Sequence, residues 1–341
     1  MKQIRLGRTG FTVSNLGFGA MHLPKLTQEE ANRVMNYALD RGITYIDTAF
    51  NYGDSQEKLG NAISHRREEF VLATKTAKRN YQEAKAEIEQ NLKLLKTDCI
   101  DILQIHYVNY ISEYKEVRSP EGAIRAAEEM KEKGYVKHIG ISGHRPELLA
   151  RWLRDYPFDT VLFHLSMVQP FAERDLMPTA LDLDVGMIAM KPLSGPFLSQ
   201  VREAIRYSGS SAAHVILSGM KSVEEVDMNM EALSAEVTAE ERSRLLDMAA
   251  GMDEHGCRRC NYCTCPLGIR IPDTIIPSRY REKYGLLGAG EAIWQKQAAL
   301  FASCLEYEPC KEKPLCEKAC PYHIPIQNEI RQLSLKAVTE K

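Results

Sequence analysis

Short runs of apolar and β-branched residues alternate with amphipathic stretches along most of the chain, and this alternation constrains the fold more than any other feature. Each short run is typical of a buried strand, and each longer stretch has the apolar spacing of a helix. The predicted strands are residues 16–19, 45–47, 70–75, 100–106, 136–142, 160–165, 187–191 and 214–218. Strands separated by helices need crossover connections, so the pattern predicts a parallel sheet, and about eight such units favour a closed (β/α)8 TIM barrel.

The competing architecture for this pattern is a doubly wound open sheet. That fold carries a glycine-rich fingerprint after its first strand, and residues 17–21 (Gly-Phe-Gly-Ala-Met) do not match it. The barrel is therefore the predicted fold of residues 1–250. Helices are predicted at residues 28–41, 82–96, 120–133, 146–155 and 223–233, and a hairpin at the bottom of the barrel is predicted for residues 4–13.

Composition narrows the range of partners. With 341 residues, 26% charged and 44% apolar, the chain is expected to be globular, with room for a main domain and a smaller one. The 44 Lys and Arg residues nearly balance the 46 Asp and Glu residues, so neither nucleic acid nor a membrane surface is expected as a partner. No signal peptide or membrane-spanning apolar run is recognisable, which predicts a cytoplasmic protein.

Polar side chains close three successive predicted strands. Asp47 ends the second, Lys75 the third and His106 the fourth, and Tyr52 follows on the loop after Asp47. In a parallel barrel the C-terminal ends of the strands meet at one mouth, where catalytic groups sit. An ammonium lowers the pKa of a neighbouring tyrosine, a carboxylate can hold that ammonium, and a histidine can hydrogen-bond a carbonyl oxygen. Any one of these residues alone could simply cap a strand, but the four together predict proton transfer to a carbonyl.

These residues belong to a series of motifs that resembles the aldo-keto reductase family. The motifs are residues 46–55 (Ile-Asp-Thr-Ala-Phe-Asn-Tyr-Gly-Asp-Ser), 59–60, 73–75, 104–106, 140–144 and 190–193. The resemblance covers most of residues 1–235 and implies a TIM barrel that binds NADP or NAD. It also implies a small-molecule substrate, a carbonyl interconverted with an alcohol, and a catalytic tetrad of Asp47, Tyr52, Lys75 and His106 in which Tyr52 is the acid and base.

The same resemblance implies a set of cofactor-binding residues. They are Gly19, Ala20, Met21, Asp47 and Met190 at the nicotinamide end, Ser142 near the carboxamide, Lys191, Leu193 and Gly195 near the pyrophosphate, and Gly219, Lys221, Ser222 and Asn229 near the adenosine. Three positions depart from the family pattern. Glu225 stands near an arginine that holds the 2′-phosphate in many NADPH-preferring members, Leu162 replaces a common glutamine, and Met190 replaces a common aromatic residue. The choice between NADP and NAD therefore stays open.

Cysteines are concentrated in the last quarter of the chain. Of the nine, Cys99 alone precedes this region, and its place at the start of an apolar strand predicts a core residue. The other eight are Cys257, Cys260, Cys263, Cys265, Cys304, Cys310, Cys316 and Cys320. Because cytosolic thiols stay reduced, such a cluster favours metal ligands over disulfides. Residues 251–341 are therefore expected to form a small metal-binding domain.

The spacing of these cysteines favours iron–sulfur clusters. The first group, Cys257-x2-Cys260-x2-Cys263-x-Cys265-Pro, is close to the ferredoxin run C-x2-C-x2-C-x3-C-P, and the second group keeps the final Cys316-x3-Cys320-Pro. Crossed ligation would give one 4Fe–4S cluster to Cys257, Cys260, Cys263 and Cys320, and a second to Cys304, Cys310, Cys316 and Cys265. The tail also resembles the ferredoxin-like, α-helical extension of an iron–sulfur branch of the aldo-keto reductases, which implies electron transfer and allows for a redox partner protein.

Two alternatives remain open from the sequence. Zinc also binds four cysteines, and it would make the tail a structural staple on a reductase. The departures at Leu162, Met190 and Glu225 allow instead an electron-transfer or docking protein whose barrel has no hydride chemistry. The identity of the substrate is not specified, because specificity depends on the loops at the barrel mouth.

Overall fold

The structure is a computed structural model that describes residues 1–194, 198–250, 252, 257–260, 262–284, 291–312 and 314–339. The chain divides into two compact units, Met1–Leu245 and Leu246–Lys341. The boundary between them lies within helix α10 (Ala239–Ala250).

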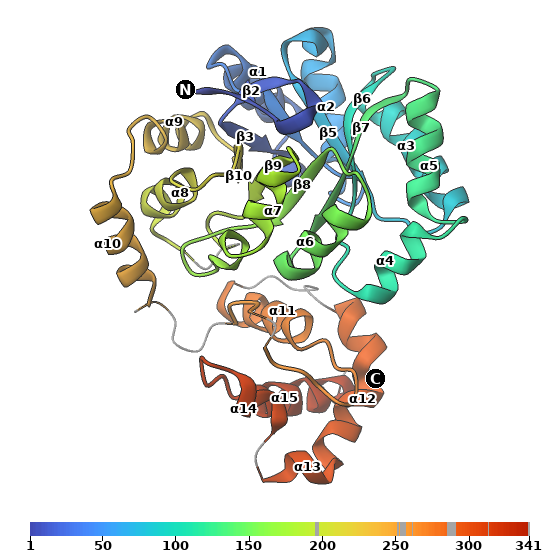
Figure 1. The fold of residues 1–341 in the computed structure, drawn as a ribbon, viewed down its shortest axis with the longest axis vertical. Coiled ribbons are helices and arrows are strands. Elements are labelled where there is room, and N and C mark those ends of the chain that lie inside the picture. Colours follow the sequence, from blue (N-terminus) through green and yellow to red (C-terminus); the bar gives the residue numbers. More distant parts are fainter. Residues whose placement is uncertain are drawn as a thin grey trace. The chain divides into compact units, whose positions relative to one another are not determined.

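The first unit is a closed parallel barrel (Figure 1). In the described part of the chain its strands are β3 (Leu16–Gly19), β4 (Tyr45–Asp47), β5 (Val71–Thr76), β6 (Ile100–Ile105), β7 (Val136–Gly143), β8 (Thr160–His164), β9 (Gly186–Met190) and β10 (Val215–Gly219). Around the barrel they follow the order β10-β3-β4-β5-β6-β7-β8-β9, and each neighbouring pair is parallel. The predicted TIM barrel is confirmed, and the C-terminal ends of its strands share one mouth.

Helices cover the outside of the barrel (Figure 1). They are α1 (Gln28–Asp40), α2 (Ser55–Ile63), α3 (Tyr81–Leu95), α4 (Ile111–Arg118), α5 (Ala123–Glu132), α6 (Pro146–Asp155), α7 (Leu176–Asp182), α8 (Val201–Gly209) and α9 (Val223–Ala232), with short 3-10 helices η2 (Ala20–Lys25), η3 (Ser64–Glu69) and η4 (Phe171–Glu173). The predicted helices α1, α3, α5, α6 and α9 are confirmed, while the sequence analysis did not predict α2, α4, α7 and α8.

A hairpin closes the end of the barrel opposite the mouth. Strand β1 (Gln3–Arg5) pairs antiparallel with β2 (Thr12–Ser14), with Ile4 opposite Val13. The short 3-10 helix η1 (Gly7–Thr9) lies in the connection between the two strands. Leu6 is fully buried in the apolar cluster inside the barrel. The backbone N–H of Arg8 donates to the Asp184 carbonyl, 2.6 Å away and just before β9 begins. The hairpin predicted at the barrel bottom is therefore confirmed.

The second unit is built from helices in its described residues. They are α11 (Ile271–Tyr284), α12 (Glu291–Glu306), α13 (Glu308–Lys311), α14 (Leu315–Ala319) and α15 (Ile326–Thr339). Its apolar core contains isoleucines, Phe301 and several cysteine side chains. Among the helices of the described residues, none combines the length and the apolar character needed to cross a membrane.

Candidate functional site

Asp47 and Lys75 form a buried ion pair at the mouth of the barrel. Asp47 ends β4 beside Gly19 of β3 and Ala73 of β5, and Lys75 lies two residues further along β5 on the same side of the strand. Lys75 Nζ lies 2.5 Å from Asp47 Oδ1 and donates to the Thr48 carbonyl at 2.6 Å. Burial lowers the pKa of Lys75 and raises the pKa of Asp47, and the attraction between the two charges opposes both shifts.

Tyr52 lies in the tight turn that joins β4 to α2. The turn is closed by the Tyr52 N–H, which donates to the Ala49 carbonyl at 3.1 Å, and by Gly53, whose φ of +57° favours glycine. Lys75 Nζ lies 5.2 Å from the centre of the Tyr52 ring. The turn therefore brings the tyrosine onto the buried ion pair.

The pKa of Tyr52 differs from the expectation based on its charged neighbour. The sequence predicts that Lys75 lowers this pKa, whereas burial, followed by the charge of Asp47, raises it. The physical reason is that the Tyr52 ring is buried, which disfavours the charged phenolate, and the nearby Asp47 carboxylate adds to this effect. Tyr52 is thus a protonated phenol, the form that donates a proton.

His106 completes the group from the end of β6. Its backbone N–H donates to the Thr76 carbonyl at 2.8 Å, and its ring lies 6.1 Å from the Tyr52 ring, nearly perpendicular to it. Burial lowers the pKa of His106 well below its usual value, and the charges of Lys75, Arg79 and Lys191 lower it further. A neutral imidazole at this position can donate one N–H to an oxygen at the barrel mouth.

A cleft is lined by β10 and by segments that follow β3, β9 and β10. It encloses about 630 Å³, including the solvent at its opening. The lining residues are His22, Lys25, Leu193, Val201, Ser218, Gly219, Lys221, Glu225, Met228 and Asn229. Four of the residues assigned to the cofactor by resemblance, Leu193, Gly219, Lys221 and Asn229, therefore lie together.

One end of this cleft is built on the N-terminus of α9. Ser222 caps the helix by accepting the Glu225 N–H at 3.3 Å, and the Lys221 N–H donates to Glu225 Oε2 at 2.8 Å. Asn229 Nδ2 donates to Ser218 Oγ at 3.2 Å, while its buried Oδ1 accepts no hydrogen bond from the described residues. An unpaired buried amide oxygen and a helix N-terminus fit a ligand with an exocyclic amine and a phosphate, as a dinucleotide has.

The other assigned cofactor residues have varied surroundings. Gly19 pairs with both Gly219 and Asp47, which joins the two ends of the candidate site, and Ala20 is buried while Met21 is exposed. Ser142 Oγ accepts the Tyr107 N–H at 2.9 Å. Met190 and Lys191 are half-buried at the end of β9, and Gly195 lies outside the described residues.

Leu162, one of the departures from the family pattern, lies opposite Ser142 in the pairing of β7 with β8. Its side chain is 1% exposed and packs in the barrel interior, with Met190 at the edge of the same cluster.

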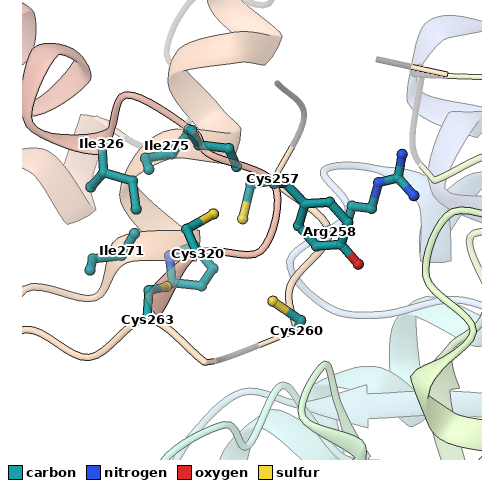
Figure 2. A pocket seen from close by; sticks show the side chains of 11 residues that line it. Cys257, Arg258, Cys260, Cys263, Ile271, Ile275, Cys320 and Ile326 are labelled. Carbon is teal, nitrogen blue, oxygen red and sulfur yellow. The ribbon is translucent and has the colours of Figure 1, made fainter. Parts of the chain in front are cut away.

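Four cysteines surround one small pocket of the second unit (Figure 2). They are Cys257, Cys260, Cys263 and Cys320, and the first three precede α11 while Cys320 follows α14. The rest of the lining is largely apolar, with Ile271, Ile275, Ile324 and Ile326 among it. Burial raises the pKa of Cys257 to about 11 and that of Cys263 to about 12, and the neighbouring thiols add to both shifts.

The remaining four cysteines form a second neighbourhood. Cys304 is hydrogen-bonded to Cys265, and the nearby Cys310 adds to the rise in its pKa. The thiols of Cys304 and Cys265 add to the rise in the pKa of Cys316, and Cys316 in turn acts on Cys263 of the first set. Burial raises the pKa of Cys304 to about 11 and that of Cys316 to about 12. Within the described part of the chain, no three His, Cys, Asp or Glu side chains form a group suited to a single metal ion.

Several residues of these sites were not found by sequence analysis. His22 and Lys25 line the cleft from η2, immediately after β3, and their signal was the position of polar residues after a strand. Val201 and Met228 line it from helices and carry no distinctive pattern. The Thr48 carbonyl, which holds Lys75, is a backbone group and leaves no trace in the sequence.

The barrel and its buried polar group define a TIM-barrel enzyme, and comparison with known proteins identifies the family. The model of the aldo/keto reductase family matches residues 15–211. The "Uncharacterized oxidoreductase YqkF" of Bacillus subtilis (strain 168) is 27% identical over 253 residues, which are 67% of this chain and 80% of that protein. The "Probable aldo-keto reductase 1" of Glycine max is 29% identical over 235 residues, which are 63% of this chain and 66% of that protein.

Solved structures show the same relationship. The holo form of aldo-keto reductase AKR11C1 from Bacillus halodurans superposes with a TM-score of 0.64 at 26% identity, covering 76% of this chain and 99% of that one. The chain belongs to the aldo/keto reductase family, and it is an oxidoreductase. The family match ends at residue 211, before the cysteine-rich unit begins.

Proposed function

We propose that the barrel interconverts a small carbonyl compound and its alcohol with NADP or NAD, using Asp47, Tyr52, Lys75 and His106. The observation that carries this proposal is the assembly of four chemically matched side chains at the strand ends, beside a cleft that fits a dinucleotide. In the direction of reduction, a nicotinamide cofactor would supply the hydride for the carbonyl carbon.

The roles of the four residues follow from their environments. Tyr52 is held protonated and gives its hydroxyl proton to the carbonyl oxygen, or takes it back in the reverse direction. His106 is held neutral and donates an N–H to the same oxygen, which orients the carbonyl. Lys75 and Asp47 fix the floor of the site under the Tyr52 ring, and the Lys75 ammonium favours negative charge that develops on the tyrosine.

The cofactor is held by residues of this chain that lie along the cleft. Lys221 and the N-terminus of α9 would hold a phosphate, and the Asn229 amide oxygen would accept a hydrogen bond from an exocyclic amine of the cofactor. Glu225 carries a carboxylate into the same end of the cleft and opposes a second phosphate there.

For the tail we propose two 4Fe–4S clusters with crossed ligation, Cys257, Cys260, Cys263 and Cys320 for one and Cys265, Cys304, Cys310 and Cys316 for the other. The two neighbourhoods of thiols support this pairing, because each contains one cysteine from the opposite sequence group. The isoleucines around the first set suit a cluster, since an apolar shell limits solvent access to it. Clusters of this kind transfer single electrons, so the proposal includes a redox partner protein. It also includes a cytoplasmic location.

One experiment tests both halves of the proposal. The full chain is purified without oxygen and analysed for iron, zinc and acid-labile sulfide, and it is then mixed with NADPH or NADH and a panel of aldehydes and ketones. We expect about eight iron and eight sulfide atoms per chain and steady turnover of a carbonyl. Zinc in place of iron would make the tail a structural staple, and iron without carbonyl turnover would favour an electron-transfer protein.

A further inference from the structure

An arginine outside the tetrad holds the backbone that carries His106. Arg79 Nη1 donates to the His106 carbonyl at 2.8 Å, and Arg79 Nη2 donates to the Tyr107 carbonyl at 2.9 Å. The planar guanidinium therefore clamps two successive carbonyls with two nitrogens in fixed geometry. These two hydrogen bonds indicate that Arg79 holds this part of the backbone in place and is not only a solvated surface residue.

The segment that Arg79 clamps has an unusual backbone conformation. Tyr107 has a φ of +54°, in the left-handed region that residues with a side chain rarely adopt. The bend is held on its other sides by the His106 N–H, which donates to the Thr76 carbonyl at 2.8 Å, and by the Tyr107 N–H, which donates to Ser142 Oγ at 2.9 Å. Such conformations persist only where the surroundings over-determine them, and they often occur at functional sites.

Arg79 is itself fixed in place by backbone contacts. Its carbonyl accepts the Ala123 N–H at 2.8 Å, and the neighbouring Asn80 forms a β-bridge with Gly122. The Tyr81 N–H donates to the Glu121 carbonyl at 2.7 Å. The loop after β5 is therefore anchored to the segment before α5, and Arg79 reaches from this anchor to the end of β6.

The charge of Arg79 also acts on the imidazole. The groups that face His106 are the Tyr52 ring and three cations, Lys75, Arg79 and Lys191. Each cation opposes protonation of the ring, in addition to the larger effect of burial.

We propose that Arg79 is a positioning residue for the carbonyl–alcohol reaction: its two hydrogen bonds to the His106 and Tyr107 carbonyls aim the His106 imidazole. The inference rests on the proposed function of the barrel. It assigns no contact between Arg79 and the substrate or cofactor.

Two variants separate the hydrogen bonds from the charge. Arg79→Gln removes both the charge and the two-nitrogen clamp, and Arg79→Lys keeps the charge but cannot hold two carbonyls in the same way. The matched control is Arg125→Gln, because Arg125 is an exposed arginine of α5 that also donates to a backbone carbonyl, that of Pro120. Folding of each variant is checked by circular dichroism and by its thermal midpoint.

The readouts are kcat, the KM of the carbonyl and of the nicotinamide, and the NMR titration of the His106 ring in the enzyme without cofactor. For Arg79→Gln we expect kcat to fall by a factor of about 10 to 100, little change in the nicotinamide KM, and a higher titration midpoint for His106. For Arg79→Lys we expect a similar fall in kcat with the midpoint of the wild type. Arg125→Gln should match the wild type in all three readouts.

The proposal is overturned if Arg79→Lys retains full kcat, or if Arg79→Gln leaves both kcat and the His106 titration unchanged. If Arg79→Gln fails to fold, Arg79→Lys decides by the same two readouts. Failure of the proposed function is distinguishable, because the wild type would then turn over no carbonyl while the His106 titration still reports whether Arg79 acts on the ring.

Discussion

Lys75 Nζ lies 2.5 Å from Asp47 Oδ1, and the two side chains are 1% and 2% exposed. Taking two charges out of water is costly, and the pair compensates this cost only while both partners are present. The Thr48 carbonyl accepts a second hydrogen bond from the same ammonium at 2.6 Å. The pair is therefore both the floor of the candidate active site and a structural unit of the barrel mouth.

Removing one partner of this pair should destabilise the barrel more than removing both. Lys75→Met leaves the Asp47 carboxylate buried without its counter-ion, and we expect the free energy of unfolding to fall by about 3–5 kcal/mol. The double variant Asp47→Asn, Lys75→Met removes both charges and should recover much of that loss. Urea unfolding followed by fluorescence measures the difference, and a double variant less stable than Lys75→Met would contradict the argument.

Replacing Tyr52 by Phe should abolish carbonyl turnover and leave the binding of NADPH or NADH unchanged. The hydroxyl is the proposed proton donor, and loss of a positioned general acid lowers the rate by about 10²- to 10⁴-fold. The cleft beside α9 is unchanged by this substitution, so titration with NADPH or NADH should give the Kd of the wild type. Tyr135→Phe is the control, because Tyr135 is an exposed tyrosine at 43% exposure. Full carbonyl turnover by the Tyr52→Phe variant would refute the assignment.

The depressed pKa of His106 predicts a loss of stability in mild acid. The folded state binds a proton at His106 less readily than the unfolded state does, so its contribution is complete above the unfolded pKa of about 6.5 and is lost as the pH falls toward the folded pKa. The slope from this one group is at most about 1.4 kcal/mol per pH unit. Because burial also lowers the pKa of His22 and His214, the wild-type slope contains their contributions with the same sign.

His106→Gln isolates the contribution of His106. We expect this variant to lose less stability between pH 7 and pH 5 than the wild type does, in urea unfolding measured at a series of pH values. The matched control is His65→Gln, which removes an exposed histidine. Identical slopes for the wild type and His106→Gln would mean that the ring is not held neutral by the fold.

The strands of the barrel were predictable because burial on both faces leaves a dense apolar signal, and a polar residue marks the end of β4 and β5. Helix α2 was not predicted, and Gly60 within it explains why. A glycine normally weakens a helix, but a Cβ at this position would come within 2.4 Å of the Leu94 carbonyl of α3. The residue that looks like a helix breaker is the one that lets two helices approach closely.

The candidate site was predictable only where side chains carry the pattern. The convergence of Asp47, Lys75 and His106 follows from the parallel topology, since all three lie at or just after the ends of their strands. The position of the Lys75 ammonium and the clamp from Arg79 depend on backbone carbonyls, those of Thr48, His106 and Tyr107. Any residue supplies a carbonyl, so no sequence pattern marks these partners.

Glu225 should make the protein bind NADH more tightly relative to NADPH. Its carboxylate accepts the Lys221 N–H at 2.8 Å and lies in the lining of the cleft, where it opposes the 2′-phosphate of NADP. We expect Glu225→Gln to lower the Kd of NADPH relative to that of NADH by a factor of about 2 to 5. The control is Glu224→Gln, which removes an exposed carboxylate from the same helical turn outside the cleft lining. An unchanged ratio of the two Kd values would exclude Glu225 as a determinant of this choice.

Pairs of cysteine variants should reveal which thiols share a cluster. Under crossed ligation Cys257 and Cys320 hold the same cluster, so the double variant Cys257→Ser, Cys320→Ser should lose about half of the iron, no more than either single variant. Cys257→Ser, Cys316→Ser touches both clusters and should lose nearly all of it. Cys99→Ser is the control, because Cys99 lies in the barrel unit and not in the tail.

The measurement is iron and acid-labile sulfide per chain after anaerobic purification. If ligation instead followed the order of the sequence, Cys257 and Cys320 would belong to different clusters, and Cys257→Ser, Cys320→Ser would lose nearly all of the iron. A third double variant, Cys257→Ser, Cys265→Ser, would then lose only half of the iron, whereas under crossed ligation it would lose nearly all of it. The two ligation patterns therefore predict opposite results for these two variants, and the proximity of Cys320 to Cys257, Cys260 and Cys263 around one pocket favours the crossed pattern.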